Sequence, residues 1–241
     1  MNLTVKNITK SYDGKIAVDD ISFEIRSGET IGILGPNGAG KTTLFYMIAG
    51  LIHSDSGTLS LSGSELNDKS ISERTAMGLS YLPQESSIFK GLSVQQNIYA
   101  ALEQRVDLGK KEKESKLSEL LEEFNLNQFS ETLGIKLSGG ERRRTEIARS
   151  LASNPQFILL DEPFAGIDPL AVSDLKDTIR SLNAKNIGVL ISDHNVRDTM
   201  HICSKVLVVN QGKIIANGQP SEIAQDDLVK EVYLGKNFLV N

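Results

Sequence analysis

The sequence predicts an α/β fold built around a parallel sheet, and three observations support this prediction. Four short apolar runs have the length and the β-branched content of strands that are buried on both faces. Polar residues follow each run at once, and helical patterns fill the chain between the second and third runs. Since open α/β sheets bind ligands at the carboxyl ends of their strands, the four runs point to one crevice. The runs are TIGIL (30–34), LSYL (79–82), FILL (157–160) and IGVLI (187–191).

The first 30 residues have a different pattern, which predicts an antiparallel unit. The segment VDDISFEI (18–25) alternates apolar and polar residues, and SYDGK (11–15) supplies a turn before it. We expect GTLSLSG (57–63) to join the same flap. Near the other end, KVLVVNQGKIIANG (205–218) predicts two strands joined by a Gln-Gly turn, and Pro220 begins a closing helix.

Between Gln84 and Asn154 the sequence shows no strand pattern. Helical periodicity fills residues 92–104 and 110–124, and a third helix follows LSGGE (137–141). We therefore expect a helical subdomain inserted into the sheet domain. The expected division is a core with its antiparallel β subdomain over residues 1–85 and 153–241, and a helical subdomain over residues 86–152.

Charge and composition exclude several classes of protein. A net charge of -5 and a pI near 5.3 argue against an extended nucleic-acid-binding face, so we expect no nucleic-acid partner. The triplet Arg142–Arg144 does not change this, since we expect it on a solvated helix face with Arg142 paired to Glu146. The single cysteine, Cys203, permits no intrachain disulfide, and we expect it as a small buried hydrophobe in a reducing compartment.

The distribution of apolar residues bears on localisation. The first residues, MNLTVKNITK, lack the basic start and apolar stretch of a secretory signal, so we expect a cytoplasmic protein. The longest apolar run, LFYMIAGLI (44–52), has about half of the roughly 18 residues that would indicate a membrane span. It therefore predicts a buried helix.

The segment GPNGAGKTT (35–43) follows the first predicted strand and is the strongest functional signal. It fits the pattern G-x-x-x-x-G-K-[ST] at Gly35, Gly40, Lys41 and Thr42. The glycines let the backbone wrap around phosphate oxygens, the lysine reaches the β and γ phosphates, and the threonine hydroxyl can hold Mg²⁺. We predict a nucleotide site here.

Acidic, basic and amide side chains follow the other predicted strands. Asp161 and Glu162 end the run FILLDE, where a buried carboxylate needs a cation or a proton. In a P-loop NTPase the first acid supports Mg²⁺ and the second orients or deprotonates the attacking water, and we assign them these roles. His194 is the candidate donor to the γ-phosphate. Gln84 is either a neutral ligand of Mg²⁺ or water, or a plain loop amide.

The segment LSGGERRRTEIARS (137–150) predicts a second anion site. A serine cap and two glycines leave the first backbone N–H groups of a helix bare, and the helix dipole adds partial positive charge there. Because the P-loop already binds phosphates, this motif raises the question of which phosphate it meets.

The ordered motifs GPNGAGKTT, YLPQE, LSGGE, FILLDEP, AGIDP and SDH resemble those of the ATP-binding subunits of ABC transporters over essentially the whole chain. The resemblance implies a P-loop NTPase (RecA-like) core, an antiparallel β subdomain and an inserted helical subdomain. It implies that two copies sandwich ATP head to tail, so that the LSGGE signature motif of each copy faces the γ-phosphate bound by the other. Glu141 is a departure, since many members carry glutamine there.

The same resemblance assigns the site residues. It implies that Glu162 and His194 are catalytic, with His194 as the γ-phosphate switch. It implies Mg²⁺ near Thr42, Gln84 and Asp161, and makes Gln84 the sensor that links the metal to the membrane partner. The residues implied to contact ATP are Tyr12, which stacks on adenine, Gly35, Pro36, Asn37, Gly38, Ala39, Gly40, Lys41, Thr42, Thr43, Gln84, Ser138, Gly139, Gly140 and Asp168, which couples the two sites.

A narrower resemblance concerns the cargo. Residues 137–176, GVLISDHNVRDTM (188–200) and VYLGKNF (232–238) are similar to the ATPase subunits of the lipopolysaccharide export systems of Gram-negative bacteria. This implies a homodimer at the cytoplasmic face of the inner membrane, beneath two different transmembrane subunits. The segment ESSIFKGLSV (85–94) lies where such subunits receive the membrane partner's coupling helix, although Phe89 is equally expected in the core.

Three alternatives remain open at the level of sequence. The ATPase of a branched-chain amino-acid importer has similar length and motifs. A soluble ABC ATPase of translation or DNA repair usually carries two fused cassettes or a long coiled-coil insertion, and this sequence has neither. A nucleotide-dependent interaction module without turnover is disfavoured by the intact Glu162 and His194.

Overall fold

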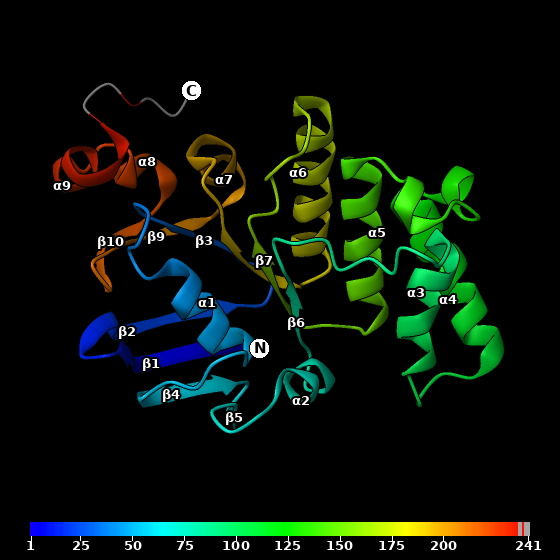
Figure 1. Cartoon of the computed structure of the whole chain (residues 1–241), viewed down its shortest axis with the longest axis horizontal. Coiled ribbons are helices and arrows are strands. Elements are labelled where there is room, and N and C mark those ends of the chain that lie inside the picture. Colours follow the sequence, from blue (N-terminus) through cyan, green and yellow to red (C-terminus); the bar gives the residue numbers. More distant parts are fainter. Residues whose placement is uncertain (236–237, 239–241) are drawn as a thin grey trace.

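The computed structural model describes residues 1–235 and 238, and its strands form two sheets (Figure 1). The six-stranded sheet contains, from edge to edge, β10 (Lys213–Gly218), β9 (Lys205–Asn210), β3 (Thr30–Leu34), β8 (Gly188–Ser192), β7 (Phe157–Asp161) and β6 (Leu79–Leu82). The four-stranded sheet contains β2 (Lys15–Arg26), β1 (Asn2–Tyr12), β4 (Ser56–Leu61) and β5 (Ser64–Glu65).

Helices cover the six-stranded sheet and extend beyond one end of it. They are α1 (Lys41–Ala49), α2 (Ile71–Ala76), α3 (Val94–Glu103), α4 (Lys110–Glu123), α5 (Gly139–Ala152), α6 (Pro169–Ala184), α7 (Val196–Ile202), α8 (Pro220–Ile223) and α9 (Asp227–Val229). Two short 3₁₀ helices, η1 (Asn127–Phe129) and η2 (Gly134–Lys136), and a π-helix, η3 (Lys230–Leu234), complete the set. Within the described residues, no helix is both long and apolar enough to cross a bilayer.

The centre of the six-stranded sheet is parallel, which confirms the predicted α/β class. β3, β8, β7 and β6 pair in parallel, and every residue of β3, β7 and β8 is buried. Alternate side chains of β7 enter opposite layers: Ile158 and Leu160 face one core cluster, while Phe157 and Leu159 face the other. The continuous apolar runs in the sequence follow from this burial on both faces.

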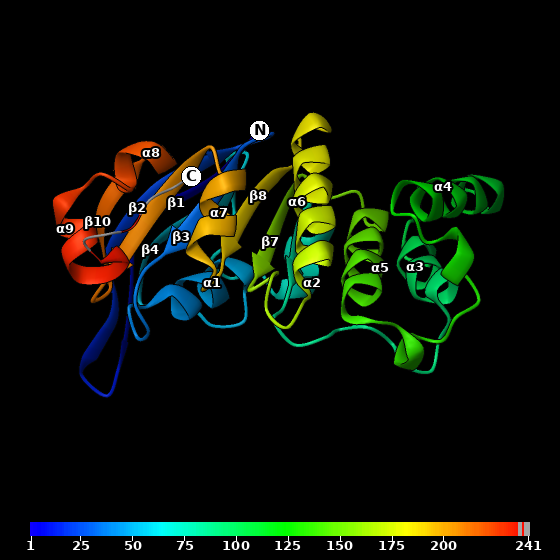
Figure 2. The ribbon, with the colours of Figure 1, turned by 90° about the horizontal axis from the view of Figure 1, so that it is seen from above.

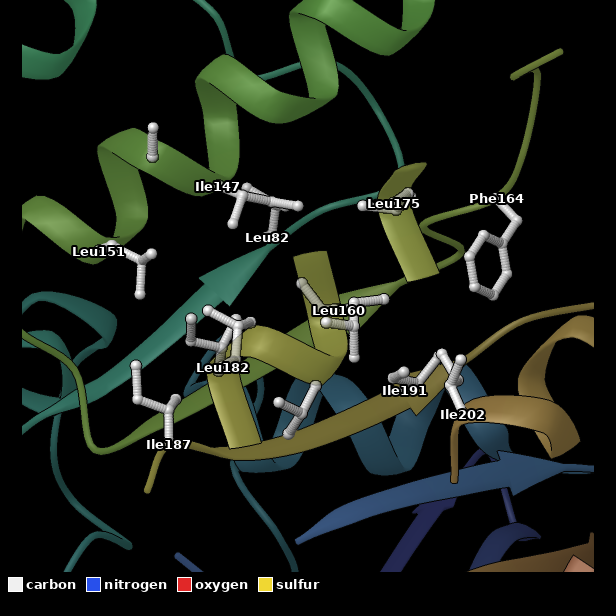
Figure 3. Close-up of a cluster of buried hydrophobic side chains, with 14 of the residues drawn as sticks. Leu82, Ile147, Leu151, Leu160, Phe164, Leu175, Leu182, Ile187, Ile191 and Ile202 are labelled. Carbon is white, nitrogen blue, oxygen red and sulfur yellow. The ribbon is translucent and has the colours of Figure 1, made fainter. Parts of the chain in front are cut away.

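One core layer lies between the sheet and the helices that follow the later strands. Figure 3 shows this layer, to which the sheet contributes Leu160 and Ile191, α6 contributes Leu175 and Leu182, and α5 contributes Ile147. The other core layer contains α1 and the inner face of the four-stranded sheet. The apolar segment at 44–52 is therefore a buried helix at its start, as predicted, and Cys203 is buried too.

Both predicted hairpins are present, with two-residue turns of the expected kind. Asp13 and Gly14 have φ values of 49° and 79°, and Gln211 and Gly212 have 47° and 80°. Positive φ at both central residues matches the right-handed twist of the flanking strands. The segment 57–63 joins the antiparallel sheet through β4, and a helix begins at Pro220, as predicted.

The segment between Gln84 and Asn154 holds α3, α4 and α5, and within it only an isolated bridge joins Ser93 to Leu133. In both ribbon views α5, α3 and α4 lie progressively farther from the six-stranded sheet (Figure 1 and Figure 2). Of the predicted segment 232–238, residues 236 and 237 lie outside the described part of the chain.

The prediction of a solvated arginine face on α5 was wrong. Arg143 is 6% exposed, and its guanidinium lies 3.2 Å from Glu146, which was expected to pair with Arg142. Arg142 instead donates to the Leu137 carbonyl at 3.0 Å. Because α5 packs against β6, the side of the helix that carries Arg143 and Glu146 is turned into the protein.

Arg74 ties the end of α1 to the connection before β6. Its side chain is buried, and Nη1 donates to the carbonyls of Met47 and Ile48 at 2.7 Å each. Nε donates to the Lys69 carbonyl at 2.9 Å. The guanidinium thus supplies donors to two carbonyls at the carboxyl end of α1, where the regular hydrogen bonds of the helix end.

We expect Arg74→Ala to lower the free energy of unfolding by about 3 kcal/mol, because it removes hydrogen-bond donors from the Met47, Ile48 and Lys69 carbonyls. Arg26→Ala is the matched control, since that side chain is 74% exposed and should change stability by about 0.5 kcal/mol or less. Urea unfolding followed by circular dichroism measures both. Equal stability of the two variants would contradict the capping role.

Candidate nucleotide-binding site

The P-loop connects β3 to α1 at the carboxyl edge of the parallel sheet. Gly35 and Gly40 have φ values of 148° and 105°, which strongly favour glycine. A Cβ atom at Gly35 would lie 2.0 Å from the Val209 carbonyl oxygen, and one at Gly40 would lie 2.2 Å from that of Ala17. The two motif glycines therefore allow the loop to pass between β9 and β2.

Lys41 begins α1 and lies across the loop. Its ammonium donates to the carbonyls of Gly35 at 2.6 Å and Pro36 at 2.9 Å. Burial lowers the pKa of Lys41, and the negative charge of Glu162 opposes this shift. The Lys41 amino group thus lies inside the loop as a hydrogen-bond donor, where phosphate oxygens need one.

Three of the predicted residues meet at Glu162. Its Oε1 lies 2.7 Å from His194 Nε2, and its Oε2 accepts a hydrogen bond from Gln84 Nε2 at 2.6 Å. Glu162 has a positive φ of 43°, and its N–H donates to the Ser192 carbonyl at 2.6 Å. The carboxylate is thus held between the loops that follow β6 and β8. Gln84 is hydrogen-bonded into the site in this structure.

Asp161, at the end of β7, is 5% exposed. Burial raises the pKa of its carboxyl group, and the neighbouring charge of Glu162 acts in the same direction. The Tyr81 hydroxyl donates to Asp161 Oδ2 at 3.2 Å and opposes the shift. Burial also raises the pKa of Tyr81, which keeps its hydroxyl protonated as a donor.

Asp193 joins the loops after β7 and β8. It is 3% exposed and accepts hydrogen bonds from the Phe164 N–H at 2.9 Å and the Asn195 N–H at 2.7 Å. Burial raises the pKa of Asp193, while these two backbone donors lower it. By fixing both loops, Asp193 sets the positions of Glu162 and His194.

A cleft of about 810 Å³ opens beside the P-loop. Tyr12 lies at this cleft with 47% of its surface exposed, and the Lys10 ammonium is 5.5 Å from the centre of its ring. The cleft brings together segments from both sheets. It is lined by Tyr12, Lys15, Ile16, Ala17, Asn37, Gly38, Ala39, Gly40, Lys41, Thr42, Thr43, Glu162, Ser192, His194, Gln211 and Gly212.

The signature motif does not line this cleft within the described part of the chain. Ser138 caps α5, and Gly139 lines a separate hollow of about 170 Å³ together with Gln84 and Glu162. Asp168 caps α6 by accepting a hydrogen bond from the Ala171 N–H at 3.0 Å. The predicted residues that do not line this cleft are Gly35, Pro36, Gln84, Ser138–Gly140, Asp161 and Asp168.

Comparisons with known proteins agree with this geometry. The family model described as "ABC transporter" matches residues 18–165, which is more than half of the chain. The chain belongs to the ABC transporter family. As an ABC ATPase it binds and hydrolyses ATP, and the P-loop cleft is the place that its motifs assign to the nucleotide.

Individual relatives match over nearly the whole length. The lipopolysaccharide export system ATP-binding protein LptB of Escherichia coli is 50% identical over 236 residues, which is 98% of each chain. The protein of the same name from Acidithiobacillus ferridurans is 47% identical over 238 residues, covering 99% of this chain and 98% of the relative. A solved ATP-binding cassette of an ABC transporter in its ADP conformation has a TM-score of 0.86 at 27% identity, over 98% of this chain and all of that one.

Sequence reasoning missed several residues of the site. Arg143, singled out as solvated, donates to the Pro83 carbonyl at 3.0 Å and so connects α5 to the loop that carries Gln84. Tyr81 lies inside a predicted strand and gave no separate signal. Gln211 and Gly212 were predicted only as a turn, yet they line the cleft. The only signal in the sequence was the Gln-Gly turn itself, and it did not indicate that this turn lies beside the P-loop.

We expect Gly40→Ala to reduce ATP affinity by about 100-fold or more, because the added methyl group collides with the Ala17 carbonyl and distorts the loop. Gly91→Ala is the control, since a Cβ there meets no atom within 4 Å. Isothermal titration calorimetry with ATP measures both variants. Wild-type affinity in Gly40→Ala would show that the loop does not need this close approach.

Proposed function

We propose that this chain is the ATPase subunit of a lipopolysaccharide exporter. The observation that carries the proposal is the 50% identity to the Escherichia coli LptB protein over 98% of both chains. The chain would work as a homodimer at the cytoplasmic face of the inner membrane, bound to two different transmembrane subunits. ATP hydrolysis would drive extraction of lipopolysaccharide from that membrane.

We infer that ATP lies along the P-loop cleft. Its phosphate oxygens would accept hydrogen bonds from backbone N–H groups of Asn37–Thr43 and from the ammonium of Lys41. The adenine would stack on Tyr12, whose half-exposed ring lies at the same cleft. The cleft, at about 810 Å³, is large enough for a nucleotide.

The residues present fit Mg²⁺. Mg²⁺ is usually bound by one or two carboxylates or hydroxyls together with substrate phosphates, and Thr42, Gln84 and Asp161 offer such oxygen atoms. When bound, Mg²⁺ neutralises charge on the β and γ phosphates. The buried carboxylate of Asp161 also gains a counter-charge in this arrangement.

Glu162 is our candidate for activating the attacking water. Its carboxylate is an acceptor that His194 and Gln84 hold in place from two sides, at 2.7 Å and 2.6 Å. Reorientation of either neighbour toward ATP would free one carboxylate oxygen to accept a proton from water. His194 would then donate to the γ-phosphate, where negative charge must be stabilised.

The separation of the signature motif from the P-loop supports a head-to-tail dimer. Ser138–Gly140 lie outside the cleft of their own chain, so in this proposal they serve the γ-phosphate of the second copy. Asp168, at the start of α6, would couple the two sites. ATP would thus form part of the interface, and hydrolysis would remove a contact that holds it closed.

The membrane partner would dock on the helical subdomain, which we place at residues 86–152, against a core of residues 1–85 and 153–241. Phe89 is 52% exposed, and the Arg149 guanidinium lies 5.0 Å from the centre of its ring. Arg149 also donates to the Ser87 carbonyl at 2.9 Å. Phe89 and Gln84 lie on the same short segment, residues 83–89. This segment would connect a docked helix to the catalytic site.

We expect Glu162→Gln to lose about 100-fold or more in ATP turnover, the scale of positioned acid–base catalysis, while it still binds ATP. With hydrolysis blocked, ATP should convert the variant to a dimer that light scattering detects. Glu119→Gln is a control, since Glu119 lies exposed on α4. Unchanged turnover would remove Glu162 from its role, and an ATP-bound monomer would count against the sandwich.

The partner proposal is tested by purifying the tagged chain from detergent-solubilised native membranes and identifying copurifying proteins by mass spectrometry. We expect two different transmembrane subunits with large periplasmic domains. Paired amino-acid permeases would instead identify an importer ATPase. Recovery of no membrane protein would favour a soluble ABC ATPase.

A further inference from the structure

Tyr81 occupies an unusual position among the residues around the nucleotide site. Among the described residues, its hydroxyl is the only side-chain donor to the Asp161 carboxylate, at 3.2 Å from Oδ2. No described residue donates to Oδ1. One oxygen of this buried carboxylate is therefore hydrogen-bonded within the protein, and the other receives no hydrogen bond from the described residues.

The ring of Tyr81 is held from the side of the P-loop. Tyr46, on α1, meets it edge to face, with the ring centres 6.4 Å apart and the planes at 82°. Tyr81 packs against the same core layer as α1 and the four-stranded sheet. Such aromatic pairs have a preferred geometry, so a shift of α1 would also displace the Tyr81 ring.

The backbone of Tyr81 belongs to the strand that leads to Gln84. Tyr81 lies in β6, which pairs in parallel with β7, and it is registered opposite Leu159, two residues before Asp161. Its side chain reaches along β7 to the end of that strand. Tyr81 thus lies in the strand before Gln84, and its side chain contacts both Tyr46 of α1 and the carboxylate of Asp161.

We propose that Tyr81 is a positioning residue for Mg²⁺: its hydroxyl fixes Asp161 Oδ2, so that Oδ1 faces the metal that ATP brings to the P-loop. The inference rests on the proposed use of Mg²⁺ at Asp161. A carboxylate that is already oriented loses less conformational freedom when the metal binds, and a ligand held by an outer hydrogen bond binds more tightly.

A packing role alone would need only the ring. Phenylalanine would preserve the edge-to-face ring contact with Tyr46 and the burial of the ring, and it would also spare the core a hydroxyl group. The hydroxyl is the part that reaches Asp161. The substitution Tyr81→Phe therefore separates the two roles. Tyr99→Phe, at a partly buried position of α3, is the matched removal of a hydroxyl outside the site.

The experiment measures the affinity of the chain for Mn²⁺, a paramagnetic substitute for Mg²⁺. Electron paramagnetic resonance is used at a saturating concentration of a non-hydrolysable ATP analogue. Affinity for the same analogue in EDTA is measured in parallel. We expect Tyr81→Phe to bind Mn²⁺ about 10- to 100-fold more weakly, the scale of losing an outer hydrogen bond to a metal ligand. Its affinity for the analogue in EDTA, and both affinities of Tyr99→Phe, should equal those of the wild type.

Two outcomes would overturn the inference while leaving the proposed function in place. Equal Mn²⁺ affinity in Tyr81→Phe and the wild type would show that the hydroxyl does not position Asp161. Loss of analogue binding in EDTA as well would show that Tyr81 maintains the fold of the cleft. If the wild type binds no Mn²⁺ at a saturating concentration of the analogue, the metal fails as part of the proposed function, and the inference fails with it.

Discussion

Three carboxylates, Asp161, Glu162 and Asp193, gather at the carboxyl ends of β7 and β8, and this concentration of negative charge constrains the rest of the site. Burial raises the pKa of Asp161 and Asp193, and each is raised further by the charge of Glu162. The protein compensates with individual partners: a tyrosine hydroxyl for Asp161, two backbone N–H groups for Asp193, and the side chains of Gln84 and His194 for Glu162. A phosphate-bound cation is the partner that the arrangement still accommodates.

Contacts on both of its sides hold the P-loop in place. The Gly212 N–H donates to the Ala39 carbonyl at 2.9 Å, and the Gly212 carbonyl accepts from the Asp19 N–H at 2.8 Å. A turn of one sheet thereby joins the loop to β2 of the other sheet. Together with the close approach of Gly40 to Ala17, this explains why the antiparallel unit packs against the nucleotide cleft and contributes Tyr12 to it.

The strands, the P-loop and the acidic pair at 161 and 162 were predictable because each depends on residues close together in sequence. Arg143 and Tyr81 were not, since their partners Pro83 and Asp161 lie 60 and 80 residues away. The triplet at 142–144 has the composition of an exposed helix face, and only the packing of α5 against β6 decides which arginine is buried. Local pattern specified the elements, whereas the orientation of α5 and the reach of side chains between strands decided the rest of the site.

The capping of α5 explains why glutamate is tolerated where many ABC proteins have glutamine. The Ser138 hydroxyl accepts from the Glu141 N–H at 3.4 Å, and the Glu141 carboxylate accepts from the Ser138 N–H at 2.9 Å. Either glutamate or glutamine can complete such a box. In the described part of the chain the N–H groups of Gly139 and Gly140 have no acceptor. Because the Ser138 and Glu141 groups bond to each other, these two glycine amides remain as donors for an anion. In the head-to-tail dimer proposed above, the γ-phosphate of the second copy would be that anion.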